Sequence, residues 1–170
     1  MSGEPEGFAE FVRAREQALQ RTAWLLTGDR ELAKDLVQTA LARVWPRWER
    51  ILRRDDPEVY VRRVMVNTWA TWTKRRWRAE RATGTLPDGP APGDVASDIA
   101  VRLAIRDVLA TLTSRQRAVL VLRVFDDLSE AQVARILDCA VGTVKSTMSQ
   151  ALAKLRANPR MAAFMEAETR

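Results

Sequence analysis

A run rich in glycine and proline near the middle of the chain limits what the chain can fold into. Residues 83–94 read TGTLPDGPAPGD, and their three glycines and three prolines interrupt any regular structure. This composition predicts a flexible linker. About 80 residues precede it and about 75 follow, which is enough for two small domains. We therefore expect domains at 8–82 and 98–157, a linker at 83–97 and a short tail at 158–170.

Apolar residues recur at helical spacing on both sides of this linker. Residues 8–27 form an amphipathic run that ends at Gly28, and a second run starts near Asp29. Its apolar stripe continues through Trp45 and Trp48, so this helix is expected to include both. No alternating strand pattern is evident, and the chain is predicted to be all-α. The other predicted helices run from Pro57 to about Arg81, around 99–112, over 115–125 and, as two shorter helices, within 128–156.

Charge and missing residue types restrict the function. Lys and Arg number 28 against 22 Asp and Glu, and the net charge of +6 favours a polyanionic partner such as nucleic acid. The chain has no histidine, a single cysteine and no glycine-rich phosphate loop. We therefore predict no catalytic residue, metal or cofactor, and no enzyme activity. The N-terminus lacks an apolar signal segment and no stretch resembles a membrane span, so a cytoplasmic protein is expected.

A helix-turn-helix pattern covers residues 128–156, LSEAQVARILDCAVGTVKSTMSQALAKLR. Ser129 and Gln132 form a capping box at the start of the first helix. The small residues Ala134 and Gly142 are expected to let the two helices approach closely. The second helix has a polar face near its N-terminus, which is the arrangement that reading of the major groove requires. The residues of this face are Thr143, Lys145, Ser146, Ser149 and Gln150.

Two readings of these features stay open from the residues alone. The motif could bind DNA, or it could be a helical hairpin with a polar outer face. The tryptophans all precede the linker, and packing in the core is favoured for them. Base stacking is the alternative for Trp69, Trp72 and Trp77, because residues 43–81 also contain twelve Arg or Lys.

Residues 113–156 closely resemble region four, the promoter-binding domain of extracytoplasmic-function (ECF) sigma factors of the sigma-70 family. This resemblance implies that the second helix of the motif reads the minus-thirty-five element. It assigns the contacts to Lys145, Ser146, Ser149 and Gln150, where the family often has an arginine at the last position.

The segment ELAKDLVQTALARVWPRW, residues 31–48, resembles the polymerase-binding helix of region two. The resemblance implies that Asp35 and Gln38 dock on the coiled coil of the largest polymerase subunit. Thr39, which stands where the family usually has an acidic residue, is assigned to the same polymerase-binding surface.

Residues 56–78 resemble the part of region two that captures the melted minus-ten element. Asn67 falls where the family has an asparagine beside the flipped base, and a loop at about 48–56 is expected to form the wall of that pocket. Thr71 replaces a common aspartate. The implied backbone-binding patch is Lys74, Arg75, Arg76 and Arg78.

The resemblance covers nearly all of residues 8–157. It implies a sigma factor that binds core RNA polymerase through its beta and beta-prime subunits, recognises promoter DNA and helps to melt the minus-ten element. An anti-sigma protein is a candidate partner. The alternative is a helix-turn-helix regulator that acts without core polymerase and uses its first half as a sensor or dimer domain.

Overall fold

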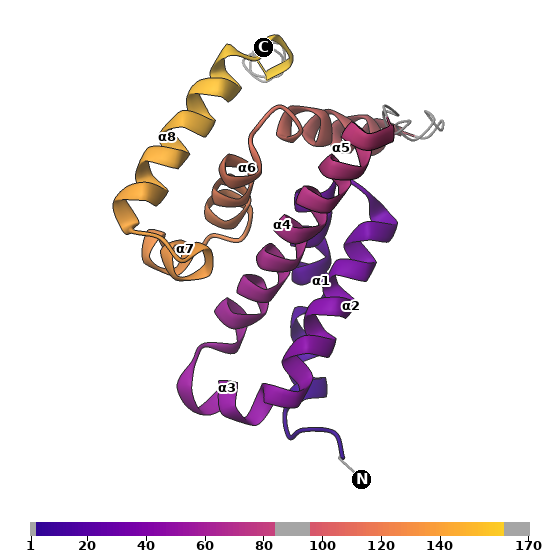
Figure 1. The fold of residues 1–170 in the computed structure, drawn as a ribbon, viewed down its shortest axis with the longest axis vertical. Coiled ribbons are helices and arrows are strands. Elements are labelled where there is room, and N and C mark those ends of the chain that lie inside the picture. Colours follow the sequence, from indigo (N-terminus) through magenta and orange to yellow (C-terminus); the bar gives the residue numbers. More distant parts are fainter. Residues whose placement is uncertain (1–2, 84–95, 162–170) are drawn as a thin grey trace.

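The computed structural model describes residues 3–83 and 96–161, and every regular element in these ranges is helical (Figure 1). This confirms the all-α prediction for the described residues. Part of the predicted linker, 84–95, and part of the predicted tail, 162–170, lie outside them. The first half contains α1 (Phe8–Thr27), α2 (Arg30–Val44), the 3-10 turn η1 (Trp45–Arg47), α3 (Trp48–Arg54) and α4 (Pro57–Thr83). The second half contains α5 (Ala96–Leu109), α6 (Ser114–Leu120), the π-helical turn η2 (Val121–Phe125), α7 (Glu130–Leu137) and α8 (Val141–Ala157).

The reversal between α1 and α2 is fixed by two adjacent residues. Gly28 ends α1 in a left-handed conformation with φ 71°, and its N–H donates to the carbonyl of Trp24 at 2.7 Å. Asp29 then caps α2, because its carboxylate accepts from the Leu32 N–H at 2.8 Å. The helices α1 and α2 pack against each other, and α2 also packs against α4.

The structure corrects the expected extent of the second helix. Trp45 and Trp48 lie beyond α2, which ends at Val44. Pro46 explains the break, since it has no N–H to donate to a carbonyl one turn earlier. Trp48 still reaches the core: its side chain is buried, and its indole N–H donates to the Glu6 carbonyl at 3.0 Å.

The helix-turn-helix is formed by α7 and α8. The capping box at Ser129 and Gln132 is confirmed, with both reciprocal hydrogen bonds present. Asp138 ends α7 in a left-handed conformation with φ 52°. The expectation for Gly142 is wrong, because a Cβ atom at this position would meet no atom of α7 within 4 Å. Ala134 is buried as expected.

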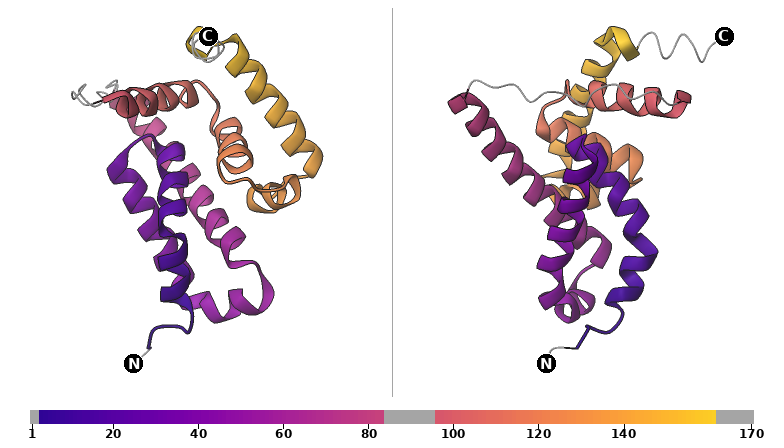
Figure 2. Two further views of the ribbon diagram at one scale, coloured as in Figure 1. Left: turned by 180° about the vertical axis from the view of Figure 1, so that it is seen from behind. Right: turned by 90° about the vertical axis from the view of Figure 1, so that its right-hand side faces the viewer.

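The two halves share one continuous hydrophobic cluster. Helix α4 packs against α7, and α1 packs against η2, so the second half lies alongside the first (Figures 1 and 2). Trp69 is buried and Trp72 is half-buried, which supports packing for these two. The side chain of Trp77 lies outside the described residues. None of the described helices is long and apolar enough to cross a membrane.

Candidate nucleic-acid interface

The outer face of α2 carries the residues predicted to bind polymerase. Leu36 and Val37 point into the core, which leaves Asp35 and Gln38 exposed. These two are three positions apart, so they lie on the same face of the helix. Thr39 follows Asp35 by four positions, so it adjoins this face, and it is half-buried. The structure therefore brings Asp35 and Gln38 together on the surface and leaves Thr39 at its margin.

Asn67 is exposed on α4 and lines a hollow of about 510 Å³. The other side of this hollow comes from the end of α2 and from η1, which supply Arg43, Pro46 and Arg47. Val64, one turn before Asn67, completes the lining. The hollow thus combines an amide, two guanidinium groups and apolar surface, which suits an unstacked base with its phosphate.

Arg43 is held beside Asn67 by the neighbouring helix. Its Nη1 donates to the hydroxyl of Thr68 at 2.8 Å, and this hydroxyl in turn donates to the Val64 carbonyl at 2.7 Å. Thr68 is only 1% exposed, so its position is set by the core. The guanidinium is therefore oriented before any ligand arrives, which lowers the entropic cost of binding.

The basic residues near the end of α4 lie on different faces of the helix. Thr71, Lys74 and Arg78 follow Asn67 by four, seven and eleven positions, and this spacing places all four on one face. Lys74 and Arg78 are exposed. Arg75 is exposed on a different face. Arg76 lines a separate hollow with Trp72, so the predicted patch of four cations is not a single surface.

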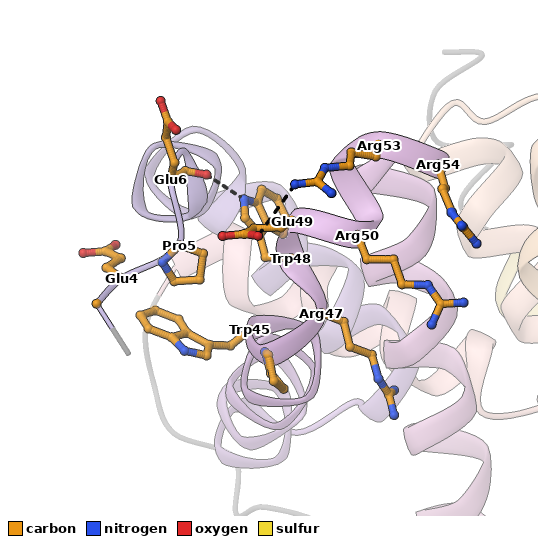
Figure 3. Close-up of a pocket in the computed structure, with 12 residues that line it drawn as sticks. Glu4, Pro5, Glu6, Trp45, Arg47, Trp48, Glu49, Arg50, Arg53 and Arg54 are labelled. Carbon is orange, nitrogen blue, oxygen red and sulfur yellow. Dashed lines mark hydrogen bonds and ion pairs between the residues drawn. The ribbon is translucent and has the colours of Figure 1, made fainter. Parts of the chain in front are cut away.

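The wall expected from a loop at about 48–56 is largely a helix. Residues 48–54 form α3, whose apolar residues Trp48 and Ile51 are buried. The helix forms because burial of these two residues anchors it, and its remaining positions are polar or exposed. It presents three exposed arginines, Arg50, Arg53 and Arg54. Together with Arg47 of η1 they line a second hollow, separate from the one beside Asn67 (Figure 3).

The predicted reading face of α8 is on the surface. Lys145, Ser146, Ser149 and Gln150 are exposed and Thr143 is half-buried, while the opposite face of the helix packs through Val144, Thr147, Ala151 and Leu155. The structure therefore brings the five predicted residues together at the N-terminal half of α8. No side chain caps this helix at Ala140, which leaves backbone N–H groups at its start for a phosphate.

Two charged neighbours on this face were missed from the sequence. Glu130 of α7 forms an ion pair with Lys145, with 3.7 Å between Oε2 and Nζ. Arg156 lines a shallow hollow of about 280 Å³ with Lys145 and Ser149. Helical spacing could have indicated Arg156, since it lies eleven positions after Lys145. Arg43 and Arg47 were also missed, because they approach Asn67 only through packing of α2 on α4.

Two protein-family models match the two halves of the chain. The family model for Sigma-70 region 2 matches residues 11–79, and the model for Sigma-70 region 4 matches residues 102–155. The first range includes α2 and the Asn67 hollow, and the second includes the helix-turn-helix. Within the described residues, no cluster of three or more His, Cys, Asp or Glu could hold a metal ion.

Related proteins match along most of the chain. It is 44% identical over 154 residues to an RNA polymerase sigma-E factor of Streptomyces coelicolor, covering 91% of this chain and 86% of that protein. It is 32% identical over 165 residues to the ECF RNA polymerase sigma factor SigL of Mycobacterium tuberculosis, covering 92% and 93%.

The fold is also similar to that of solved structures. The sigma factor RpoE of Bartonella quintana, in complex with the anti-sigma factor NepR, superposes with a TM-score of 0.77 at 22% identity, covering 90% of this chain and 96% of that one. CnrH, in complex with the cytosolic domain of CnrY, gives a TM-score of 0.69 at 18% identity, covering 97% and 91%. Together with the two family models and the sequence relatives, this places the chain in the family of extracytoplasmic-function RNA polymerase sigma factors.

Proposed function

We propose that this sigma factor uses three separate surfaces, each assigned to one partner. The α2 surface of Asp35 and Gln38 binds core RNA polymerase at the beta-prime subunit. The Asn67 hollow holds the non-template strand of the minus-ten element. The N-terminal half of α8 reads the minus-thirty-five duplex. The chain recruits core polymerase to the promoter and captures the separated strand. RNA synthesis itself is catalysed by the polymerase.

The Asn67 hollow is the observation that carries this proposal. A duplex-binding regulator needs a groove-reading helix but no recess for an unstacked base. The hollow has such a recess, with the amide of Asn67 for the base edge and Arg43 and Arg47 for the phosphate. From it, Lys74 and Arg78 continue along one face of α4 for about 17 Å, at 1.5 Å per residue. This length suits a few nucleotides of single-stranded backbone.

On α8, Lys145 and the neighbouring hydroxyl and amide groups supply phosphate and base contacts. Promoter specificity then comes from two DNA contacts of moderate affinity, one at each promoter element, which are linked because both belong to one chain. The second half binds the beta subunit of polymerase in this proposal. An anti-sigma protein is the proposed regulatory partner, and the cytoplasm is the proposed place of action. The similarity to sigma factors solved with NepR and CnrY supports an anti-sigma partner.

Transcription in vitro with core polymerase, followed by mapping of the start sites, tests the function as a whole. A gel shift of promoter fragments with and without core polymerase accompanies it. We expect the free chain to bind promoter duplex poorly and the holoenzyme to bind it specifically. Tight and specific duplex binding by the free chain would instead support the regulator that acts without polymerase, a reading that no observation currently favours.

A matched pair of variants tests the polymerase surface. Asp35→Asn should weaken binding to core polymerase about tenfold, because a charged contact at the interface is lost. Glu31→Gln lies one turn earlier on α2, where Glu31 is exposed and forms an ion pair with Lys34 at 3.4 Å. Fluorescence anisotropy with labelled chain measures both. Equal affinities for the two variants would remove Asp35 from the interface.

A further inference from the structure

A hollow of about 610 Å³ lies against α4 on the side of the helix away from Asn67. Helix α4 lines it with Trp69, Trp72, Thr73 and Arg76, which share one face through their spacing of three, four and seven positions. That face is about 200° from the one that carries Asn67, at about 100° per residue. The end of α1, the start of α2, the turn between α5 and α6, and α6 complete the lining. We call it the α4–α6 hollow, and none of the residues proposed above to bind polymerase or DNA lines it.

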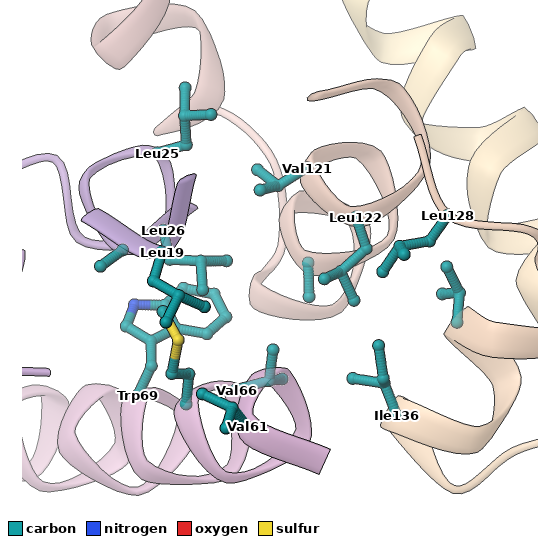
Figure 4. Packing of buried hydrophobic residues seen from close by; sticks show 14 of the residues in the cluster. Leu19, Leu25, Leu26, Val61, Val66, Trp69, Val121, Leu122, Leu128 and Ile136 are labelled. Carbon is teal, nitrogen blue, oxygen red and sulfur yellow. The ribbon is translucent and has the colours of Figure 1, made fainter. Parts of the chain in front are cut away.

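Apolar side chains form part of this hollow. Leu26 of α1 and Trp69 of α4 are buried in its wall (Figure 4), as is Leu112 from the turn before α6. Trp72 packs against the core but is only half-buried, so part of its indole stays accessible. A partly exposed indole that is held in the wall of a recess offers a surface on which a flat ring can stack.

Two guanidinium groups from different helices supply the charge of the hollow. Arg76 comes from α4 and Arg117 from α6, and Ser114, the first residue of α6, adds an exposed hydroxyl. None of the described residues that line the hollow is acidic. The α4–α6 hollow therefore favours an anion, whose phosphate or carboxylate oxygens accept hydrogen bonds from guanidinium groups.

The hydrogen bonds of Arg117 are incomplete. Its Nε donates to the carbonyl of Leu25 at 2.7 Å, whereas its Nη2 is buried with no partner among the described residues. Burial also lowers the pKa of Arg117 from 12.5 to about 10. Its third nitrogen, Nη1, is not fully buried and makes no hydrogen bond within the described part of the chain. Because a poorly hydrated cation with incomplete hydrogen bonds is costly, an anion at Nη1 is stabilised more than at a fully exposed arginine.

These features together restrict the chemistry of an occupant. Inorganic phosphate would contact the arginines but leave the Trp72 surface in water, and a neutral aromatic molecule would do the reverse. A volume of about 610 Å³ lies within the range of sites for small organic ligands. A nucleoside monophosphate combines the two required parts, a flat base and a phosphate, in one molecule of suitable size.

We propose that the α4–α6 hollow is a binding site for a small aromatic anion of the nucleoside monophosphate class. Its phosphate contacts Arg76 and Nη1 of Arg117, and the hydroxyl of Ser114 donates to another phosphate oxygen. Its base stacks on Trp72. Because the hollow lies apart from the surfaces for polymerase and DNA, the free chain binds this ligand without either partner.

Isothermal titration calorimetry of the full chain tests the site with AMP, GMP, CMP and UMP as probes. Inorganic phosphate and the corresponding nucleosides are the matched ligand controls, because each carries only one of the two required parts. We expect at least one monophosphate to bind. Its nucleoside and inorganic phosphate should each bind about tenfold more weakly or worse, because either the charge-assisted contacts or the stacking is lost.

Arg76→Gln and Arg75→Gln form a matched pair of variants. The two arginines are adjacent and exposed, and each change removes one positive charge, but Arg75 does not line the hollow. Arg76→Gln should weaken nucleotide binding about tenfold, roughly the value of one charge-assisted contact, whereas Arg75→Gln should bind like the wild type. Arg117→Gln should weaken binding at least as much. If its circular dichroism shows unfolding, because the Leu25 contact is also lost, the Arg76 and Arg75 pair decides the test.

Nitrogen-15 NMR of the tryptophan indoles locates the bound nucleotide. The six indole signals are assigned through single tryptophan-to-phenylalanine variants. The signal of Trp72 should move on addition of nucleotide, and that of Trp45, which lines the hollow beside α3, should not.

Any of four results would overturn the proposal. The first is that no monophosphate binds the wild type at millimolar concentration, and the second is equal affinity of Arg76→Gln and Arg75→Gln. The third is movement of the Trp45 signal without that of Trp72, which would place the nucleotide among the α3 arginines. The fourth is inorganic phosphate that binds as tightly as the monophosphates, which would exclude an aromatic ligand.

Discussion

Replacing Ile136 with alanine tests whether the two halves unfold as one unit. Ile136 is 1% exposed on α7, and its side chain points toward α4 (Figure 4). Removal of three buried carbons costs about 2.4 kcal/mol in transfer free energy at about 0.8 kcal/mol each. The residual cavity raises the loss in the free energy of unfolding to about 3 kcal/mol. For a chain of this size, the midpoint of thermal unfolding should fall by about 6–12 °C.

The distribution of tryptophans makes the assay selective. All six lie in the first half, whereas Ile136 lies in the second, so tryptophan fluorescence reports unfolding of the half that was not mutated. Circular dichroism reports the helices of both halves. We expect the two probes to show one coincident transition that is shifted downward. Leu52→Ala, at a position 49% exposed on α3, serves as the control and should shift neither probe appreciably.

A split outcome would refute the reasoning. If circular dichroism showed an early transition while the fluorescence midpoint stayed at the wild-type temperature, the halves would be energetically independent. The shared core would then contribute no measurable coupling.

Three further variants test the site. Asn67→Ala should make the free energy of open-complex formation less favourable by about 1–3 kcal/mol, the value of a base-specific contact, as measured by permanganate reactivity of the minus-ten strand. Binding in the closed complex should change little, and an equal loss in both would contradict the assignment. Lys145→Ala should reduce promoter-dependent transcription with unchanged affinity for core polymerase, and reduced affinity would place Lys145 elsewhere. Ser129→Ala should lower the free energy of unfolding in urea by about 1 kcal/mol through loss of the α7 cap, and an unchanged midpoint would show that the capping box is not needed.

Much of the local structure could be predicted from the sequence. The end of α1 at Gly28, the cap at Asp29 and the capping box at Ser129 depend on hydrogen bonds between residues at most a few positions apart. The exposed face of α8 follows from helical spacing alone. These features were predictable because local geometry determines them. The extent of α2 was not predicted correctly, since the apolar stripe continues past Val44 although Pro46 interrupts the backbone hydrogen bonds.

The composition of the sites depended on long-range packing. Arg43 contacts Thr68 across 25 positions, and this contact completes the hollow beside Asn67. The sequence contains many arginines before the linker, and their spacing does not indicate which of them adjoin that residue. Packing of α2 against α4 selects Arg43 and Arg47, because both lie where α2 ends and the chain turns.

By itself, the sequence determined that the chain is helical, that it has two parts, and which faces of α2 and α8 meet solvent, because periodicity and caps act within each helix. Only the tertiary structure decided how the two parts meet. Asp126 and Asp127 are adjacent and chemically identical, yet one is a buried link to Arg62 and the other is exposed. That distinction arises from a partner 64 positions away, and it exists only once η2 has packed against α1 and α7 against α4.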